Sequence, residues 1–161
     1  MYYLIGMVEP LVFNAIIPSE SGEVWKAWTT ESGVRTFFAP ECKIDLRSGG
    51  AYEMYFDLDA PAGSRGGEGC VILAVDPQKM LSLTWNAPPE LPDIRFQRTH
   101  VTIRFESVSS HSAKITLTHD GWGTSPNWEA ARTYFERAWG EIVIPRLINR
   151  FTVGPIHWGN Q

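Results

Sequence analysis

The chain has 161 residues, of which 43% are hydrophobic and 20% are charged, a composition typical of one globular domain of ordinary size. Its 14 Lys and Arg residues and 18 Asp and Glu residues give a net charge of −4, so it has no broad basic surface for the phosphate backbone of a nucleic acid. Seven Trp, eight Phe and five Tyr are more large rings than such a core needs, and this excess needs a physical reason.

The sequence also argues against several kinds of site. Neither a CxxC pair nor a neighbouring His pair accompanies Cys42 and Cys70, so we expect free thiols and no disulfide framework, metal site or cofactor. Residues 1–10 lack the basic start of a secretory leader. The longest uninterrupted apolar run, residues 70–75, is far shorter than the roughly 20 residues of a transmembrane helix. These features predict a cytoplasmic protein that does not span a membrane.

The first elements expected along the chain are a strand and two short helices. Apolar residues occupy every second position of residues 11–17, which predicts a strand that Pro18 ends. Helical spacing of apolar residues predicts a short helix over residues 20–29. A second short helix is expected over residues 31–38, because the residue before Pro40 is pushed out of the helical conformation.

The middle of the chain has the pattern of a sheet. Between residues 41 and 120, short apolar segments alternate with turn sequences rich in Gly, Pro and Ser, and we expect six strands there. Most of them have an apolar residue at every second position, which predicts one buried face and one wet face. The exception is the run 69–75, which is apolar on both faces, so the pattern leaves open whether Cys70 or Val71 points inward.

The chain then returns to a helix, predicted over residues 126–150. Ser125 is its expected N-cap, and Pro126 stands in the first turn, where a missing N–H costs nothing. Pro145 removes a backbone hydrogen bond and should kink the last turns. The buried stripe predicted for this helix consists of Trp128, Ala131, Phe135, Ala138 or Trp139, and Ile142. The tail 151–161 carries further apolar residues and should dock on the body of the domain or on a partner.

This order of elements predicts an α+β fold. A doubly wound sheet would alternate strands with helices, whereas here two short helices follow the first strand and one long helix ends the chain. Short turns between the strands imply an antiparallel sheet. We therefore expect a curved sheet of about seven strands wrapped around the long C-terminal helix. One helix cannot fill the whole concave side of such a sheet, so a cavity is expected between the two.

An ordered series of short segments runs through the chain. The segments are VWKAWTT at 24–30, FF at 37–38, SGGAY at 48–52, DP at 76–77 before LSLTW at 81–85, LTHDGW at 117–122, and Trp139. Together they resemble the homologues of the activator of the heat-shock protein 90 ATPase, which belong to the helix-grip superfamily of START lipid-transfer domains and the birch-pollen allergen. At Trp28 the family often has an aliphatic residue, and at Phe38 it commonly has Trp.

The resemblance covers about residues 13–150, which is nearly the whole chain. It implies a helix-grip fold and a single START-like domain over residues 1–161. The core of this domain would extend over residues 11–150, and the tail would be residues 151–161, for which the family has no counterpart.

Ten residues are candidates for contact with a small molecule in the expected cavity. The alternation of each strand or helix places nine of them on inward faces, and Trp122 lies beside one of these positions. The ten are Trp28, Phe38, Tyr52, Met54, Phe56, Trp85, His119, Trp122, Phe135 and Trp139. Inward aromatic residues usually pack as an ordinary core, so the sequence leaves open which rings line a cavity and which fill the core.

His119 is the most informative polar residue, because alternation from Ile115 and Leu117 places it on the inward face. A buried imidazole needs partners for both of its nitrogens. Either it bonds a backbone carbonyl at the turn into the long helix, or it contacts a ligand. No nucleophile motif and no carboxylate pair accompanies it, so we assign no catalytic residue.

Two loops should border the cavity. Residues 63–69 are rich in Gly, but no helix follows them, which disfavours a phosphate site and favours a mobile hairpin loop at the cavity rim. Arg95, Arg98 and His100 follow the proline-rich residues 87–92. They form either a solvated patch or a polar rim that recognises an acidic group of a ligand.

Three functions follow from these observations as alternatives. The aromatic excess and the expected cavity favour a protein that binds a small hydrophobic molecule. The resemblance alone implies an interaction protein that stimulates a chaperone ATPase. The superfamily also contains cyclases and hydrolases, so an enzyme that works in the cavity is the third alternative. The apolar residues near the chain ends, residues 2–5 together with Ile156 and Trp158, would suit a homodimer contact.

Overall fold

The computed structural model of this protein describes residues 8–159. The β-strands are β1 (Leu11–Ile17), β2 (Glu41–Ile44), β3 (Tyr52–Tyr55), β4 (Ile72–Asp76), β5 (Met80–Trp85), β6 (Thr99–Ser109) and β7 (Ser112–Asp120). The helical segments are α1 (Ser21–Thr29), α2 (Glu31–Val34), α3 (Pro126–Arg137), the π-helix η1 (Ala138–Val143) and α4 (Ile144–Thr152). The predicted α+β fold, with two short helices after the first strand and a long helix at the end, is confirmed.

The strands form two antiparallel sheets that adjoin at one edge. The larger sheet has the order β1-β7-β6-β5-β4, and the smaller one pairs β2 with β3. The Tyr52 N–H donates to the Cys70 carbonyl at 2.9 Å, and the Ile72 N–H donates to the Gly50 carbonyl at 2.8 Å. These bonds and the bridge between Ala51 and Val71 continue the hydrogen bonding from the edge of the larger sheet to β3. The seven strands therefore make one continuous surface.

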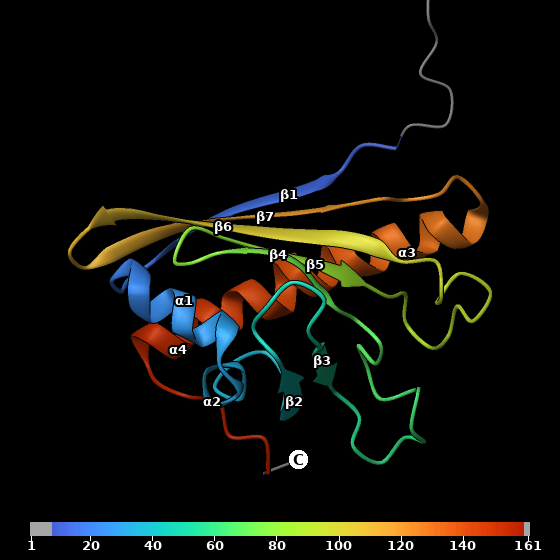
Figure 1. The fold of residues 1–161 in the computed structure, drawn as a ribbon, viewed down its shortest axis with the longest axis horizontal. Coiled ribbons are helices and arrows are strands. Elements are labelled where there is room, and N and C mark those ends of the chain that lie inside the picture. The colour runs from blue at the N-terminus through green and yellow to red at the C-terminus, as the bar shows by residue number, and fades with distance from the viewer. Residues whose placement is uncertain (1–7, 160–161) are drawn as a thin grey trace, which may run out of the picture.

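The alternation in the strands determines which face of the sheet is buried. On β7 the side chains of Ala113, Ile115, Leu117 and His119 are fully buried, whereas the residues between them are partly exposed. Cys70 is also fully buried, which settles the choice between Cys70 and Val71. In Figure 1 the C-terminal helix runs between β1 and the smaller sheet, so this apolar face packs against the helix.

The two short helices differ from prediction only at their ends. The helix α2 ends at Val34, earlier than expected, and the chain continues to Phe38 in turns in which the Phe37 and Phe38 N–H groups donate to the Val34 carbonyl. These turns bury Phe37 and Phe38 against Trp28 of α1, with ring centroids 5.0 and 5.3 Å apart. The apolar side of α1 is thus joined to the core through aromatic contacts.

The C-terminal helix contains a π-helical segment instead of a simple kink. In η1 the Ile144 N–H donates to the Trp139 carbonyl five residues earlier, and Pro145, which has no N–H, follows directly. A π turn accommodates one residue more than an α turn, so side chains beyond it occupy a different face from that extrapolated by α-helical spacing. Within η1 itself Val143 is buried, and Ile142 is 46% exposed and not buried as predicted.

The tail after α4 docks on the body of the domain. The Ile156 N–H donates to the Thr36 carbonyl at 3.0 Å, and the Trp158 Nε1–H donates to the Arg35 carbonyl at 2.6 Å. The Arg146 guanidinium lies 5.2 Å from the centre of the Trp158 ring. Trp158 therefore packs against its own chain. The other residues that we considered for a dimer contact, residues 2–5, lie outside the described residues.

No helix in the described part of the chain is both long and apolar enough to cross a membrane.

Candidate functional site

A cavity of about 230 Å³ lies against the C-terminal helix. Five of its lining residues are among the ten predicted from the sequence: Phe38, Phe56, Trp85, Phe135 and Trp139. The other five were not predicted, and they are Tyr134, Ala138, Ile142, Val143 and Arg146. Four of the residues in the cavity wall belong to η1, so the π-helical segment forms much of the helical side of the cavity.

Three buried rings form a compact aromatic surface in this cavity. The Phe38 ring is stacked on that of Trp85 with centroids 5.9 Å apart, and Trp139 lies 5.8 Å from both of them. All three side chains are at most 3% exposed. Because their positions are set by packing in the core, they present a rigid apolar surface on which a planar ligand can stack.

Phe56 differs from the inward orientation predicted for it. β3 ends at Tyr55, so the strand alternation no longer applies, and the Phe56 side chain is 44% exposed. Its ring still lies 5.8 Å from that of Phe38 and lines the cavity. Phe56 and the half-exposed Tyr134 therefore lie at the boundary between the cavity and solvent.

A second cavity of about 490 Å³ adjoins the first one. The two share Phe56, Trp85, Tyr134 and Phe135 in their walls. The remaining wall of the larger cavity comes from α3 and from the loops at residues 57–66 and 86–95. Ligand pockets commonly have volumes of roughly 300–1,000 Å³, so the larger cavity has the size of a binding site and the smaller one extends it toward the aromatic surface.

The other five predicted residues are buried in the core and line neither cavity. Trp28, Tyr52 and Met54 are fully buried, and the Tyr52 hydroxyl donates to the Trp28 carbonyl at 2.7 Å. Trp122 donates its Nε1–H to the His119 carbonyl at 3.0 Å. These side chains hold β3, α1 and the turn after β7 together, which is the core packing that the sequence left open as an alternative.

His119 is the centre of a buried hydrogen-bond network that joins the helix to the sheet. The Trp139 Nε1–H donates to His119 Nδ1 at 3.0 Å, so this nitrogen carries no proton and His119 Nε2 donates to Thr99 Oγ1 at 2.7 Å. Thr99 Oγ1 donates in turn to the Trp85 carbonyl at 3.4 Å. Both imidazole nitrogens are therefore occupied, and the network links two residues of the cavity wall, Trp85 and Trp139.

The surroundings of His119 favour its neutral form. Desolvation is the main cause and the nearby His100 adds to it, and together they lower the pKa of His119 from 6.5 to about 3. Protonation of His119 Nδ1 would also set its N–H against the Trp139 N–H, so that two donors would face each other without an acceptor. Neither a proton-transfer role nor a direct ligand contact is suited to an imidazole whose two nitrogens already have partners.

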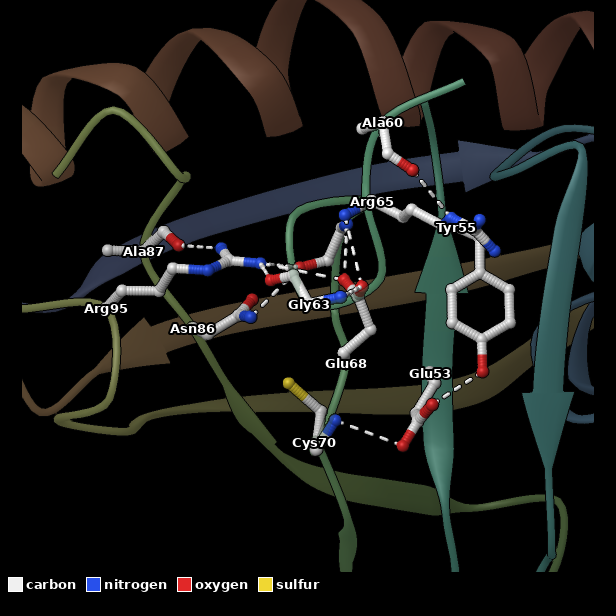
Figure 2. Close-up of polar contacts among 12 residues, drawn as sticks. Glu53, Tyr55, Ala60, Gly63, Arg65, Glu68, Cys70, Asn86, Ala87 and Arg95 are labelled. Atoms are coloured by element: carbon white, nitrogen blue, oxygen red, sulfur yellow. Dashed lines mark hydrogen bonds and ion pairs between the residues drawn. The ribbon is translucent and has the colours of Figure 1, made fainter. Parts of the chain in front are cut away.

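The glycine-rich loop encloses a carboxylate of its own. Figure 2 shows Glu68 within this loop, where its carboxylate accepts hydrogen bonds from the N–H groups of Gly63, Arg65 and Gly66. Desolvation would raise the pKa of Glu68, but the backbone N–H groups outweigh it and hold the pKa below its usual value. The loop resembles an anion-binding site that an internal side chain occupies.

Arg95 joins this loop to the one that follows β5. Its guanidinium donates to the carbonyl groups of Ala87, Gly63 and Gly66 and lies 3.6 Å from the Glu68 carboxylate (Figure 2). Arg95 is only 5% exposed and lines the larger cavity, so of the two alternatives left open by the sequence the solvated patch does not apply to it. These contacts connect residues 63–68 to the loop that follows β5.

Arg98 and His100, the other two residues of the predicted polar rim, line neither of the two cavities. Arg98 contacts the Cys70 sulfur at 3.8 Å, and the exposed His100 lies 3.4 Å from the Asp120 carboxylate. Burial raises the pKa of Cys70 to about 12 and that of Cys42 to about 11, so both thiols stay protonated. No group of three or more His, Cys, Asp or Glu side chains within residues 8–159 could hold a metal ion.

Comparisons with known proteins agree with this architecture. A family model described as "Activator of Hsp90 ATPase homolog 1-like protein" matches residues 19–147. A search of curated proteins finds no match. The solved structure of protein MLL2253 from Mesorhizobium loti has a TM-score of 0.68 and 20% sequence identity, with 88% of this chain and 95% of that chain covered.

Two further solved structures are informative. The solution structure of the Aha1 dimer from Colwellia psychrerythraea has a TM-score of 0.68 and 16% identity, and it covers 91% of this chain and 98% of that chain. DynU16, a protein from the dynemicin biosynthetic locus, has a TM-score of 0.66 and 15% identity, with 92% and 49% covered, respectively. At such identities the likeness shows that the fold is shared.

Proposed function

The chain belongs to the family of Activator of Hsp90 ATPase homolog 1-like proteins, and from this membership together with its cavities we propose that it binds a small apolar or aromatic molecule in the cytoplasm. The ligand lies between the sheet and the C-terminal helix. It contacts Phe38, Phe56, Trp85, Phe135 and Trp139. The other five predicted residues support this site from the core.

One observation carries the proposal, namely the aromatic surface formed by Phe38, Trp85 and Trp139 at the cavity. A ligand on this surface also covers the half-exposed rings of Phe56 and Tyr134, and removing their apolar surface from water is the main driving force for binding in such sites. The adjoining cavity provides the volume that a ligand larger than one ring system needs. The shared fold of DynU16, a protein of a biosynthetic locus, supports a role with small molecules.

Filling the smaller cavity should prevent this binding. Val143 is 7% exposed and lines the cavity, so the ring introduced by Val143→Phe would occupy space that the ligand needs. With the neutral fluorescent probe N-phenyl-1-naphthylamine, we expect the affinity to fall by at least about tenfold. The measurement is a fluorescence titration of wild type and variant at matched protein concentration.

The matched control is Val12→Phe, the same substitution on the outer face of β1, where the side chain is 53% exposed. This variant should bind the probe as the wild type does. Thermal unfolding of both variants establishes that they are folded. Equal probe affinity in the folded Val143→Phe variant and the wild type would contradict the proposed site, as would a wild type that does not bind the probe.

The family description supports stimulation of a chaperone ATPase as a second candidate function. The two variants also distinguish this candidate from the first, because an interaction surface on the outside of the domain does not depend on the cavity. ATPase stimulation by the wild type that Val143→Phe leaves unchanged would favour the second candidate. Absence of any stimulation of a purified Hsp90 would exclude it.

A further inference from the structure

Arg146 introduces a positive charge into an otherwise apolar cavity wall. It is the only one of the ten lining residues that carries a charge, and no Asp or Glu is among them. Within residues 8–159 no carboxylate oxygen lies within 4.0 Å of its guanidinium nitrogens, and its side chain makes no hydrogen bond. The Arg146 guanidinium carbon lies over the Trp158 ring, 5.2 Å from its centre.

Other groups in the same wall add hydrogen-bond donors. Trp85 is 3% exposed, lines both cavities, and has no hydrogen-bond partner for its indole N–H in the described part of the chain. The hydroxyl of Tyr134 is the second polar group. The N–H of Trp139 is not available, because it donates to His119. The wall thus offers donors and a cation, and it lacks the carboxylate that would balance them.

The physical chemistry of this wall favours an anionic ligand. A half-buried guanidinium gives up part of its hydration, and an anionic oxygen restores that loss best through charge-assisted hydrogen bonds. Such an ion pair is also less screened beside apolar walls than in water. Contact with the Trp158 ring holds the guanidinium in place before a ligand arrives, which reduces the entropy that binding would cost.

We propose that the ligand of this cavity is an aromatic oxyanion, a planar ring system with a carboxylate or phenolate oxygen that pairs with Arg146. This inference rests on the proposed small-molecule function and specifies its ligand class. The ring body stacks on Phe38, Trp85 and Trp139, and the anionic group lies at the Arg146 side of the cavity. A neutral molecule of the same shape binds more weakly, and an aromatic cation does not bind.

Two probes of nearly the same shape test this assignment, namely 2-naphthoate, which is anionic, and 2-naphthamide, which is neutral. Both are titrated against the full chain by isothermal titration calorimetry. The wild type should bind the naphthoate at least about tenfold more tightly than the amide, since hydrogen bonds to charged groups are stronger than neutral ones. In Arg146→Met this preference should disappear while the affinity for the amide stays unchanged.

The matched control is Arg137→Met on α3. Arg137 is exposed, pairs with Glu141 at 3.3 Å and does not line either of the two cavities, so its loss should leave the preference intact. If Arg146→Met does not fold, the salt dependence of the wild type decides instead. Naphthoate binding should weaken between 50 and about 500 mM salt more than amide binding does.

The outcomes separate the two proposals. Equal binding of both probes by the wild type, or a naphthoate preference that persists in folded Arg146→Met, overturns the ligand class and leaves the binding function in place. A wild type that binds neither these probes nor N-phenyl-1-naphthylamine overturns both.

Discussion

Replacing His119 with alanine is expected to lower the free energy of unfolding by about 4 kcal/mol, which is a large part of the stability of a domain of this size. The imidazole is fully buried, so its removal leaves a cavity in the core. It also leaves the Trp139 N–H without its acceptor and removes the N–H that donates to Thr99 Oγ1. Urea unfolding followed by circular dichroism measures the change.

The matched control is His100→Ala on the neighbouring strand. The side chain of His100 is 51% exposed and lies 3.4 Å from Asp120, and surface pairs of this kind contribute little. Its substitution should change the free energy of unfolding by less than about 0.5 kcal/mol. Similar losses in the two variants would show that the network around His119 does not stabilise the fold as we infer.

The same network predicts that the domain loses stability as the pH falls below neutrality. The pKa of His119 is about 3 in the folded protein against its ordinary value of 6.5, so the unfolded chain binds a proton in this range that the folded protein does not. The contribution of the neutral imidazole is fully present above pH 6.5 and is lost as the pH falls toward 3. Between pH 7 and pH 5 the loss amounts to about 2 kcal/mol.

A variant that keeps a polar side chain but does not titrate isolates this effect. We expect His119→Gln to have a lower stability at pH 7 and a shallower decline between pH 7 and pH 5 in urea unfolding. The pKa of Glu68, lowered from 4.5, affects stability mainly below pH 5 and so lies outside this window. A decline as steep in His119→Gln as in the wild type would contradict the assignment to His119.

Strand alternation could be predicted from the sequence because it depends on local pattern alone. The inward faces of β5, β6 and β7 follow from apolar residues at every second position, and all of them are buried. The same reasoning failed at Phe56, where the strand ends one residue earlier. A strand boundary depends on hydrogen bonds to a distant segment, here the bond of the Phe56 N–H to the Arg65 carbonyl, and no local pattern reveals it.

All five cavity-lining residues that we did not predict lie on the C-terminal helical segments. Helical spacing of 3.6 residues correctly placed Phe135 and Trp139 inward, but it also predicted a buried Ile142 and gave no indication of Arg146. The π turn at η1 shifts the phase of the residues that follow it. Pro145 was a usable signal of irregularity, although it indicated only that the helix changes there and not how.

Packing between loops was the other feature beyond the reach of sequence patterns. The glycine-rich residues 63–69 look open in the sequence, yet Arg95 donates to the Gly63 and Gly66 carbonyls from a loop that only folding brings next to them. Whether each of the ten predicted residues fills the core or lines a cavity depends on the space left between packed elements. An alternation pattern shows which face a side chain takes and gives no information about that space.

The docked tail has a practical consequence for preparing this protein. Trp158 donates to the Arg35 carbonyl and lies against the Arg146 guanidinium at the cavity wall. A tag or other extension placed next to Trp158 would lie beside these contacts and would disturb the guanidinium that we assign to ligand recognition. Binding measurements should therefore use protein whose tag is at the N-terminus and has been cleaved off.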